Sequence, residues 1–229
     1  MIIDWQRVGF VHGVMNTDNM SILGLTIDFG PYGWLEGFDF GWTPNTTDIQ
    51  HKRYRYGNQP NMGLWNLYQL ANSLYPIIEE VAPLNAILEQ YKIDFEIKSL
   101  QMMKSKLGLF SSDENDVELI QNLEDTLQLA ETDMTIFFRN LSNFSDENSD
   151  FHLIKDSFYD LENISEEVKN KWTNWFKKYA ERLQFDRVSS EERKEKMDAV
   201  NPKYVLRNYM SQMAIDEADK GNYSLIDEL

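Results

Sequence analysis

The feature that most limits the possible folds is a long region of helical periodicity that begins near residue 61. Apolar residues recur there every three or four positions, as they do along one face of an α-helix. The same spacing returns in the stretches 84–107, 117–130, 132–142 and 168–183. We therefore expect a mainly α-helical chain, in which Pro76 kinks or ends the first of these helices.

Three polar positions indicate where the later helices begin. Ser165 precedes two glutamates, and Ser189 stands three residues before Glu192, which is the spacing of a capping box. Asn201-Pro202 is typical of a cap followed by the first helical residue. We therefore expect the last long helix to start at that point.

Two other segments have simple structural interpretations. Trp172, Trp175 and Tyr179 lie on one stripe of the helix predicted at 168–183, which favours core packing. The acidic run SDENSD at 145–150 is typical of a solvated loop.

Charge and composition exclude several classes of function. The 229 residues carry 22 Lys and Arg against 38 Asp and Glu, a net charge of −16. Such a chain would be repelled by nucleic acid and by anionic membranes. It has no cysteine, which excludes disulfides and thiolate chemistry. Because it also shows neither a membrane-length apolar run nor a basic leader, we expect a cytoplasmic protein.

The residues best suited to chemistry lie in FVHGVMNTDNMSILGLTIDFG, residues 10–30. A helix is expected over 2–11, and the two apolar runs around Gly24 predict a β-hairpin over 21–28. Such a hairpin would bring Asp18 and Asn19 close to Asp28. Carboxylate and amide oxygens suit Mg²⁺ or Mn²⁺, which also takes oxygens from substrate phosphates. This spacing is compatible with a metal–nucleotide site, and equally with ordinary turn residues, since Asn and Asp are common in turns.

The segment 29–60 is rich in glycine, proline and aromatic residues, which predicts a long but packed loop. It contains a second Asp-Phe-Gly at Asp39, which we interpret as loop packing because the hairpin argument selects Asp28. It also contains the basic stretch HKRYRYGNQP at 51–60. Its Lys and Arg could pair with acidic neighbours, or they could contact phosphate or a protein substrate.

The strings HGVMNTDN and LTIDFG resemble the catalytic loop and metal-binding segment of the protein kinase-like superfamily. The closer resemblance is to small-molecule kinases, whose loop reads His-Gly-Asp with Asn five residues after the Asp. His12, Gly13 and Asn19 match that pattern, with His12 expected to hold the loop in place. Val14 occupies the position of the catalytic Asp and cannot accept a proton, which leaves Asp18 as the nearby carboxylate.

Three longer blocks resemble the selenoprotein O family, also called the YdiU-like proteins. They read HGVMNTDNMSILGLTIDFGPYGWLEGFDF, YRYGNQPNMGLWNLYQLANSLYP and NPKYVLRNYMSQMAI. The resemblance covers residues 5 to 225 and implies transfer of AMP from ATP to Ser, Thr or Tyr hydroxyls of protein substrates. It implies that Asp18 is the proton acceptor, that Asn19 and Asp28 bind Mg²⁺ or Mn²⁺, and that Asp28 also lies near the nucleotide.

The same resemblance implies a single kinase-like C-lobe over residues 1–229. Residues 1–30 would form the catalytic loop and hairpin, 31–60 an activation-segment-like loop, and 61–229 a helical region. The family's nucleotide-binding lobe and C-terminal tail have no counterpart in this sequence, so we expect a C-lobe portion with weak or no activity alone. A separate chain is one source of the missing lobe, and apolar surface that the lobe would cover is expected to be exposed.

Two alternatives differ in kind from AMP transfer. The first is a phosphotransferase of the small-molecule kinase type, and the second is an inactive helical remnant or interaction module. A gain of phosphate on an acceptor would indicate the first, and the absence of metal-dependent ATP turnover the second.

Overall fold

The computed structural model of the protein describes residues 1–145 and 148–229. Helices dominate the fold, and the described residues form one sheet of two short antiparallel strands. The helices are α1 (Ile2–Val8), α2 (Gln59–Ile78), α3 (Val81–Lys106), α4 (Asp116–Leu127), α5 (Met134–Leu141), α6 (Glu166–Leu183), α7 (Ser190–Val200), α8 (Asn208–Ala218) and α9 (Ser224–Glu228). The strands are β1 (Phe10–Val11) and β2 (Gly33–Trp34). The expectation of a mainly α fold with a small antiparallel β element is confirmed.

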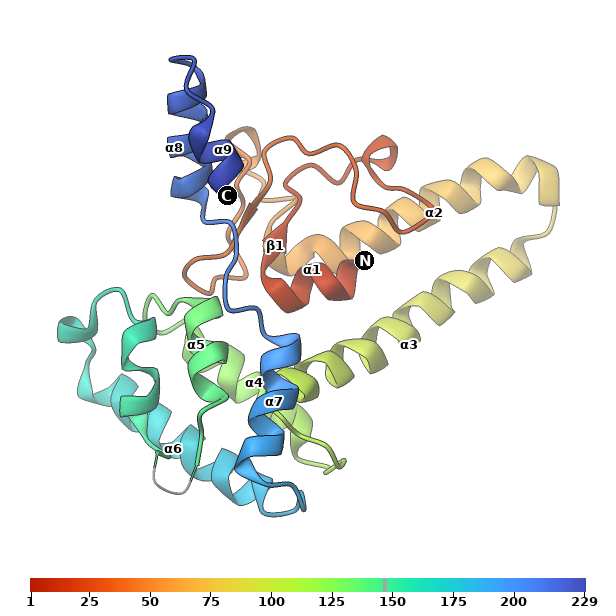
Figure 1. The fold of residues 1–229 in the computed structure, drawn as a ribbon. Helices are drawn as coiled ribbons and strands as arrows, with labels where there is room; N and C mark the ends of the chain where they lie inside the picture. Colours follow the sequence, from red (N-terminus) through yellow and green to blue (C-terminus); the bar gives the residue numbers. More distant parts are fainter. Residues whose placement is uncertain (146–147) are drawn as a thin grey trace.

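Helices α4 to α7 surround the main hydrophobic core at the base of the molecule (Figure 1). Trp172, Trp175 and Tyr179 of α6 are almost fully buried there, as their spacing predicted. The predicted caps are also present. The Ser165 hydroxyl accepts a hydrogen bond from the Val168 amide at 3.3 Å, and a second serine, at the start of α7, caps that helix in the same way. The expected loop at 145–150 includes residues 146–147, which lie outside the described residues.

The prediction of a helix starting at Asn201-Pro202 is wrong, because α8 begins only at Asn208. Asn201 serves the preceding helix instead. Its backbone amide donates to Met197 of α7, and its buried side chain donates to the Lys106 carbonyl oxygen at 2.9 Å. Its side-chain oxygen is buried without a hydrogen-bond partner among the described residues, because residues 202–207 form no helix whose amides it could cap.

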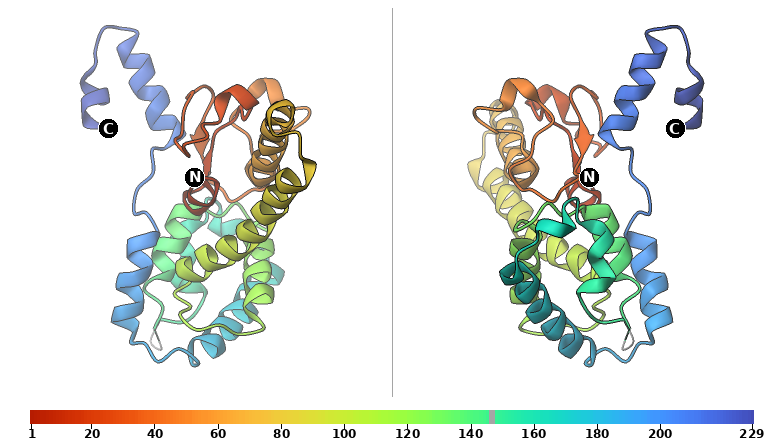
Figure 2. Two further views of the ribbon diagram at one scale, coloured as in Figure 1. Left: turned by 90° about the vertical axis from the view of Figure 1, so that its right-hand side faces the viewer. Right: turned by 90° about the vertical axis from the view of Figure 1, so that its left-hand side faces the viewer.

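Two helical pairs project from the body. Helices α2 and α3 form a long antiparallel arm, and α8 with α9 forms a shorter one that stands away from the other helices (Figures 1 and 2). Pro76 lies inside the last turn of α2, which ends two residues later at Ile78. The buried residues of α2 are Gln59, Met62, Gly63 and Asn66, whereas much of its apolar stripe is exposed. This helix therefore turns a partly polar face toward the N-terminal segment.

The two strands pair at Phe10 with Trp34 and at Val11 with Gly33, so they close a long loop over residues 12–32. The β-hairpin predicted over 21–28 is wrong, because no residue in that stretch is in a strand. The Gly24 amide donates to the Ser21 carbonyl oxygen and forms only a turn. Ile22 remains 83% exposed, because no neighbouring strand offers backbone partners for the alternating pattern.

Candidate active site

The first part of the candidate site is the catalytic-loop segment at residues 12–19, which lies against the segment that follows Asp28. Gly13 has φ +81°, and a Cβ atom built on it would lie 2.2 Å from the Pro31 carbonyl oxygen. Only glycine tolerates both the left-handed backbone and this close approach. Asn45 adds a hydrogen bond of 3.0 Å from its side-chain amide to the Gly13 carbonyl oxygen. The two limbs of the loop are therefore held side by side.

His12 is fully buried and joins these two limbs. Its Nε2 atom lies 2.8 Å from the carbonyl oxygen of Ile27, the residue before Asp28. The Val14 amide donates to His12 Nδ1 at 3.4 Å, so Nδ1 is the acceptor and Nε2 carries the proton that binds Ile27. The structural role expected for His12 agrees with this geometry, since both ring nitrogens are engaged with backbone groups.

Asp18 and Asn19 lie in a single 3-10 turn over Thr17–Asn19. The Asn19 side-chain NH₂ donates to the Val14 carbonyl oxygen at 3.0 Å, which fixes the orientation of the amide. Within residues 1–145 and 148–229, neither the Asp18 carboxylate nor Asn19 Oδ1 takes part in a protein hydrogen bond or ion pair. Both groups are therefore open to a ligand from solvent.

Asp28 has a left-handed backbone, with φ +56°, and its carbonyl oxygen accepts the Gly30 amide at 2.8 Å. Aspartate tolerates this region better than most residues, so the strain is modest. Its side chain is exposed, and no group in the described part of the chain donates to its carboxylate. The Asp-Phe-Gly at Asp39 differs, because Asp39 Oδ1 accepts the Gly41 amide at 2.6 Å and is used within its own turn.

The structure thus ties Asn19 and Asp28 to the same three residues, 12–14, through Val14 and through the His12–Ile27 contact. It shows no direct contact among the side chains of Asp18, Asn19 and Asp28. In the stretches of chain that the structure describes, no group of three or more His, Asp or Glu side chains is arranged to hold a metal ion. The predicted set contains only two carboxylates and one amide, so phosphate oxygens would have to complete it.

Two residues of α2 that the sequence analysis did not select, Gln59 and Asn66, bind the backbone of the loop. The buried Gln59 side chain donates to the Phe10 carbonyl oxygen at 2.9 Å and accepts the His12 amide at 3.0 Å. Asn66, seven residues after Gln59 in α2, donates to the Met15 carbonyl oxygen at 3.2 Å. Their helical spacing on α2 was visible, but a lone Gln or Asn gives no indication that it is buried.

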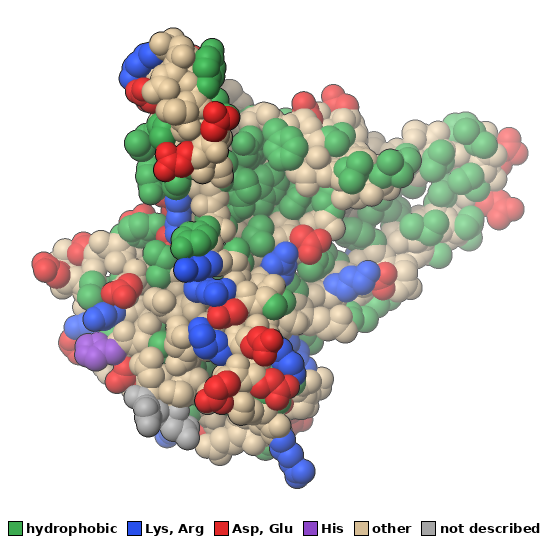
Figure 3. All heavy atoms as spheres, viewed as in Figure 1, with side chains coloured by type: hydrophobic (Ala, Val, Ile, Leu, Met, Phe, Trp, Pro, Cys, Tyr) green, Lys and Arg blue, Asp and Glu red, His purple; other side chains and the backbone are tan. Residues whose placement is uncertain are grey.

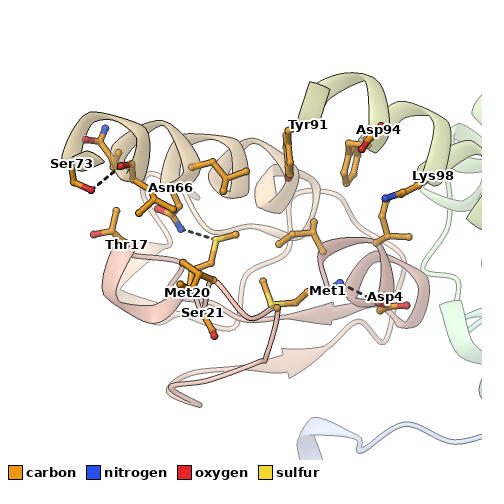
Figure 4. A pocket seen from close by; sticks show the side chains of 18 of the residues that line it. Met1, Asp4, Thr17, Met20, Ser21, Asn66, Ser73, Tyr91, Asp94 and Lys98 are labelled. Carbon is orange, nitrogen blue, oxygen red and sulfur yellow. Dashed lines mark hydrogen bonds and ion pairs between the residues drawn. The ribbon is translucent and has the colours of Figure 1, made fainter. Parts of the chain in front are cut away.

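A groove of about 940 Å³ borders the site between α1, α2 and α3 (Figure 4). Thr17 and Met20, on either side of the Asp18–Asn19 pair, line one wall, and Tyr91 and Lys98 of α3 line another. The turn that carries Asp18 is therefore the edge of an open hollow rather than part of a flat surface.

The helical body agrees with the mainly α fold expected from the sequence. The family model described as "Protein adenylyltransferase SelO" matches residues 1–229, so the chain belongs to the SelO family. Two curated proteins named "Protein nucleotidyltransferase YdiU" illustrate the similarity. The one from Flavobacterium johnsoniae is 58% identical over 232 residues, and the one from Aromatoleum aromaticum is 48% identical over 229 residues. Each match covers 100% of this chain and 44% of the relative.

The chain therefore spans less than half the length of the curated relatives that it matches. Along its described stretches, no helix combines the length and apolar character that crossing a membrane requires.

Proposed function

We propose that this chain carries the catalytic loop of a metal-dependent protein adenylyltransferase, which transfers AMP from ATP to Ser, Thr or Tyr hydroxyls of proteins. The observation that carries the proposal is the match of residues 1–229 to an adenylyltransferase family. Because the chain covers 44% of its relatives, the full activity is assigned to a longer or two-chain protein, and nucleotide affinity in this chain alone is expected to be weak.

Asn19 and Asp28 would hold Mg²⁺ or Mn²⁺. The fit rests on their chemistry and exposure, since Asn19 Oδ1 and the Asp28 carboxylate are hard oxygen ligands with no hydrogen bond from the described residues. A bound ion of this kind neutralises the charge of the triphosphate and stabilises the pentavalent transition state. The Asn19 hydrogen bond to Val14 leaves the amide oxygen turned away from that contact and free to bind.

Asp18 would take the proton of the acceptor hydroxyl. The hydroxyl oxygen then forms a bond to the α-phosphorus of ATP, the bond from that phosphorus to the bridging oxygen breaks, and pyrophosphate leaves. Val14 cannot perform this role, because its side chain neither accepts a proton nor orients a hydroxyl. The exposure of Asp18 supports the assignment, since the acceptor must reach it from solvent.

The test compares the two Asp-Phe-Gly segments. Mn²⁺ is titrated with ATP into the wild-type chain, Asp28→Asn and Asp39→Asn, with bound Mn²⁺ followed by electron paramagnetic resonance. Asparagine tolerates the left-handed backbone of Asp28, so the variant keeps the loop while removing the charge. We expect at least tenfold weaker binding for Asp28→Asn and an unchanged affinity for Asp39→Asn.

Equal Mn²⁺ affinities of Asp28→Asn and Asp39→Asn would contradict the assignment of Asp28 as a metal ligand. Mass spectrometry of a protein acceptor incubated with ATP and Mn²⁺ then identifies the reaction. A gain of AMP that is lost in Asp18→Ala supports the proposal, and a gain of phosphate supports the phosphotransferase. No gain, together with no Mn²⁺–ATP binding, supports an interaction module.

A further inference from the structure

A basic turn at residues 51–55 stands out in this acidic chain. It carries His51, Lys52, Arg53 and Arg55, and none of these forms an ion pair with any described residue. Lys52 and the Asp39 carboxylate both lie near Gly41 without pairing. The interpretation of this stretch as charges neutralised by acidic neighbours therefore does not agree with the structure.

The carboxylate nearest to the turn in the sequence, that of Asp48, binds backbone amides of the turn and does not pair with its cationic side chains. The buried Asp48 side chain accepts the backbone amides of Arg53 at 3.0 Å and Tyr54 at 2.7 Å. Asn58 adds a hydrogen bond of 2.6 Å to the Arg53 carbonyl oxygen. The backbone of the turn is thus fixed on both sides.

Lys52 has φ +48°, a left-handed conformation that costs about 1–2 kcal/mol in a residue with a Cβ atom. Such strain persists only where the surroundings impose it, and it is common at ligand-binding segments. The Arg53 guanidinium lies 4.6 Å from the centre of the Trp65 ring of α2, which holds the exposed charge in place. The backbone of Lys52 and the guanidinium of Arg53 are therefore held at the surface.

The position of the basic turn relates it to one side of the site. The Tyr54 hydroxyl donates to Asn16 Oδ1, two residues before Asp18. The Asp28 side of the loop is held elsewhere, by His12 through Ile27. The turn is therefore fastened to the segment that carries Asp18, the residue proposed to take the proton of the acceptor hydroxyl.

We propose that the basic turn binds carboxylate side chains that flank the acceptor hydroxyl, so that the substrates are Ser, Thr or Tyr residues in acidic segments of proteins. This inference rests on the proposed function for the role of Asp18. A chain of net charge −16 repels acidic segments over most of its surface, so an unpaired cationic turn at the site directs where they dock.

The experiment measures binding without ATP. A fluorescein-labelled peptide with a central Tyr among Asp residues is titrated with the chain and followed by fluorescence anisotropy, and the same peptide with Asn for Asp is the ligand control. The test variant is Lys52→Asn with Arg53→Gln, because Asn suits the left-handed position. The matched control is Lys177→Gln with Arg187→Gln, two exposed body residues that form no ion pair within the described part of the chain.

We expect the Asp peptide to bind at least tenfold more tightly than the Asn peptide. The basic-turn variant should lose at least tenfold in affinity and the control less than twofold, with the circular dichroism of both unchanged. Equal losses in both variants, or equal binding of the two peptides, would overturn the inference. Peptide selectivity that stays intact while Asp28→Asn and Asp39→Asn bind Mn²⁺ with equal affinity would instead overturn the proposed function alone.

Discussion

The helical body and the front of the molecule hold their shape by different means. In the body, residues 109–200, aromatic side chains such as Trp172 and Phe137 are fully buried in one large core. At the front, residues 1–60, Leu35, Phe38 and Tyr56 belong to the same large core. A second core of a few residues lies beneath front loops in which Ile22 and Leu23 are 83% and 78% exposed. Apolar atoms are prominent around the front and the two arms, while charged side chains are spread over much of the body (Figure 3).

The difference separates two sources of order. The body is stabilised by apolar surface removed from water, at roughly 25 cal/mol per Å². The loop over residues 12–32 at the front depends on polar side chains that satisfy its backbone groups, such as Gln59, Asn66 and Asn45. The body should therefore unfold as one unit, and this loop should open locally.

The largest effect is expected in the body core. Trp172→Ala removes a side chain with no exposed surface and should lower the free energy of unfolding by about 3–5 kcal/mol. Leu23→Ala, at a front position that is 78% exposed, should cost about 1 kcal/mol or less. Urea denaturation followed by circular dichroism measures both, and similar losses would remove the distinction between the two regions.

A smaller and more local effect is expected at the front. Gln59→Ala leaves the Phe10 carbonyl and the His12 amide without their partner, which should cost about 1–3 kcal/mol. Hydrogen exchange should accelerate over residues 10–32 and stay unchanged over α6. Gln128→Ala, at an exposed glutamine that directly follows α4, is the control and should change neither. Faster exchange throughout the body would show that front and body open together.

The smallest effect is expected where α3 contacts α1, between the body and the front. Lys106 of α3 donates to the Arg7 carbonyl oxygen of α1 at 2.6 Å, and burial lowers its pKa to about 7. The unfolded chain keeps this proton up to its ordinary pKa of 10.5, so the unfolded state binds more protons between those values. Lys106 should therefore contribute a rise in the free energy of unfolding of about 1 kcal/mol from pH 7 to 8.

Lys106→Met should remove this contribution. Burial raises the pKa of Glu124 to about 7, which gives a slope of opposite sign in both proteins. The difference between wild type and Lys106→Met isolates the lysine. Urea midpoints at pH 7 and pH 8 measure it, and identical slopes would show that the amine keeps its proton when buried.

The sequence was sufficient where local patterns decide the structure. The buried stripe of α6 and the serine caps at Ser165 and Ser189 follow from spacing alone. The sequence was not sufficient where the structure of a segment depends on a contact with a residue far away along the chain. The alternation over 21–28 does not reveal that no strand lies beside it, and Asn201 gives no sign of its bond to Lys106, 95 residues away.

The candidate site divides in the same way. The motif and the family resemblance were enough to select Asp18, Asn19 and Asp28. Their roles, Asp18 as proton acceptor and the other two as metal ligands, stay predictions. The supports Gln59 and Asn66 could not be selected, because hydrogen bonds across about 50 positions leave no mark on the local pattern. Nor did the basic stretch disclose that Asp48 binds backbone amides rather than the cations.

Asn208 has a wider consequence for how this protein can be divided. Its side chain donates to the Trp34 carbonyl oxygen at 2.9 Å and accepts the Trp34 amide at 3.3 Å, so a residue from the last helical arm acts as an edge partner for β2. Arg207 beside it pairs with the buried Asp133 at 2.6 Å. The beginning and the end of the chain are thus interlocked, and a boundary drawn after α7 would cut through one cooperating unit rather than between two.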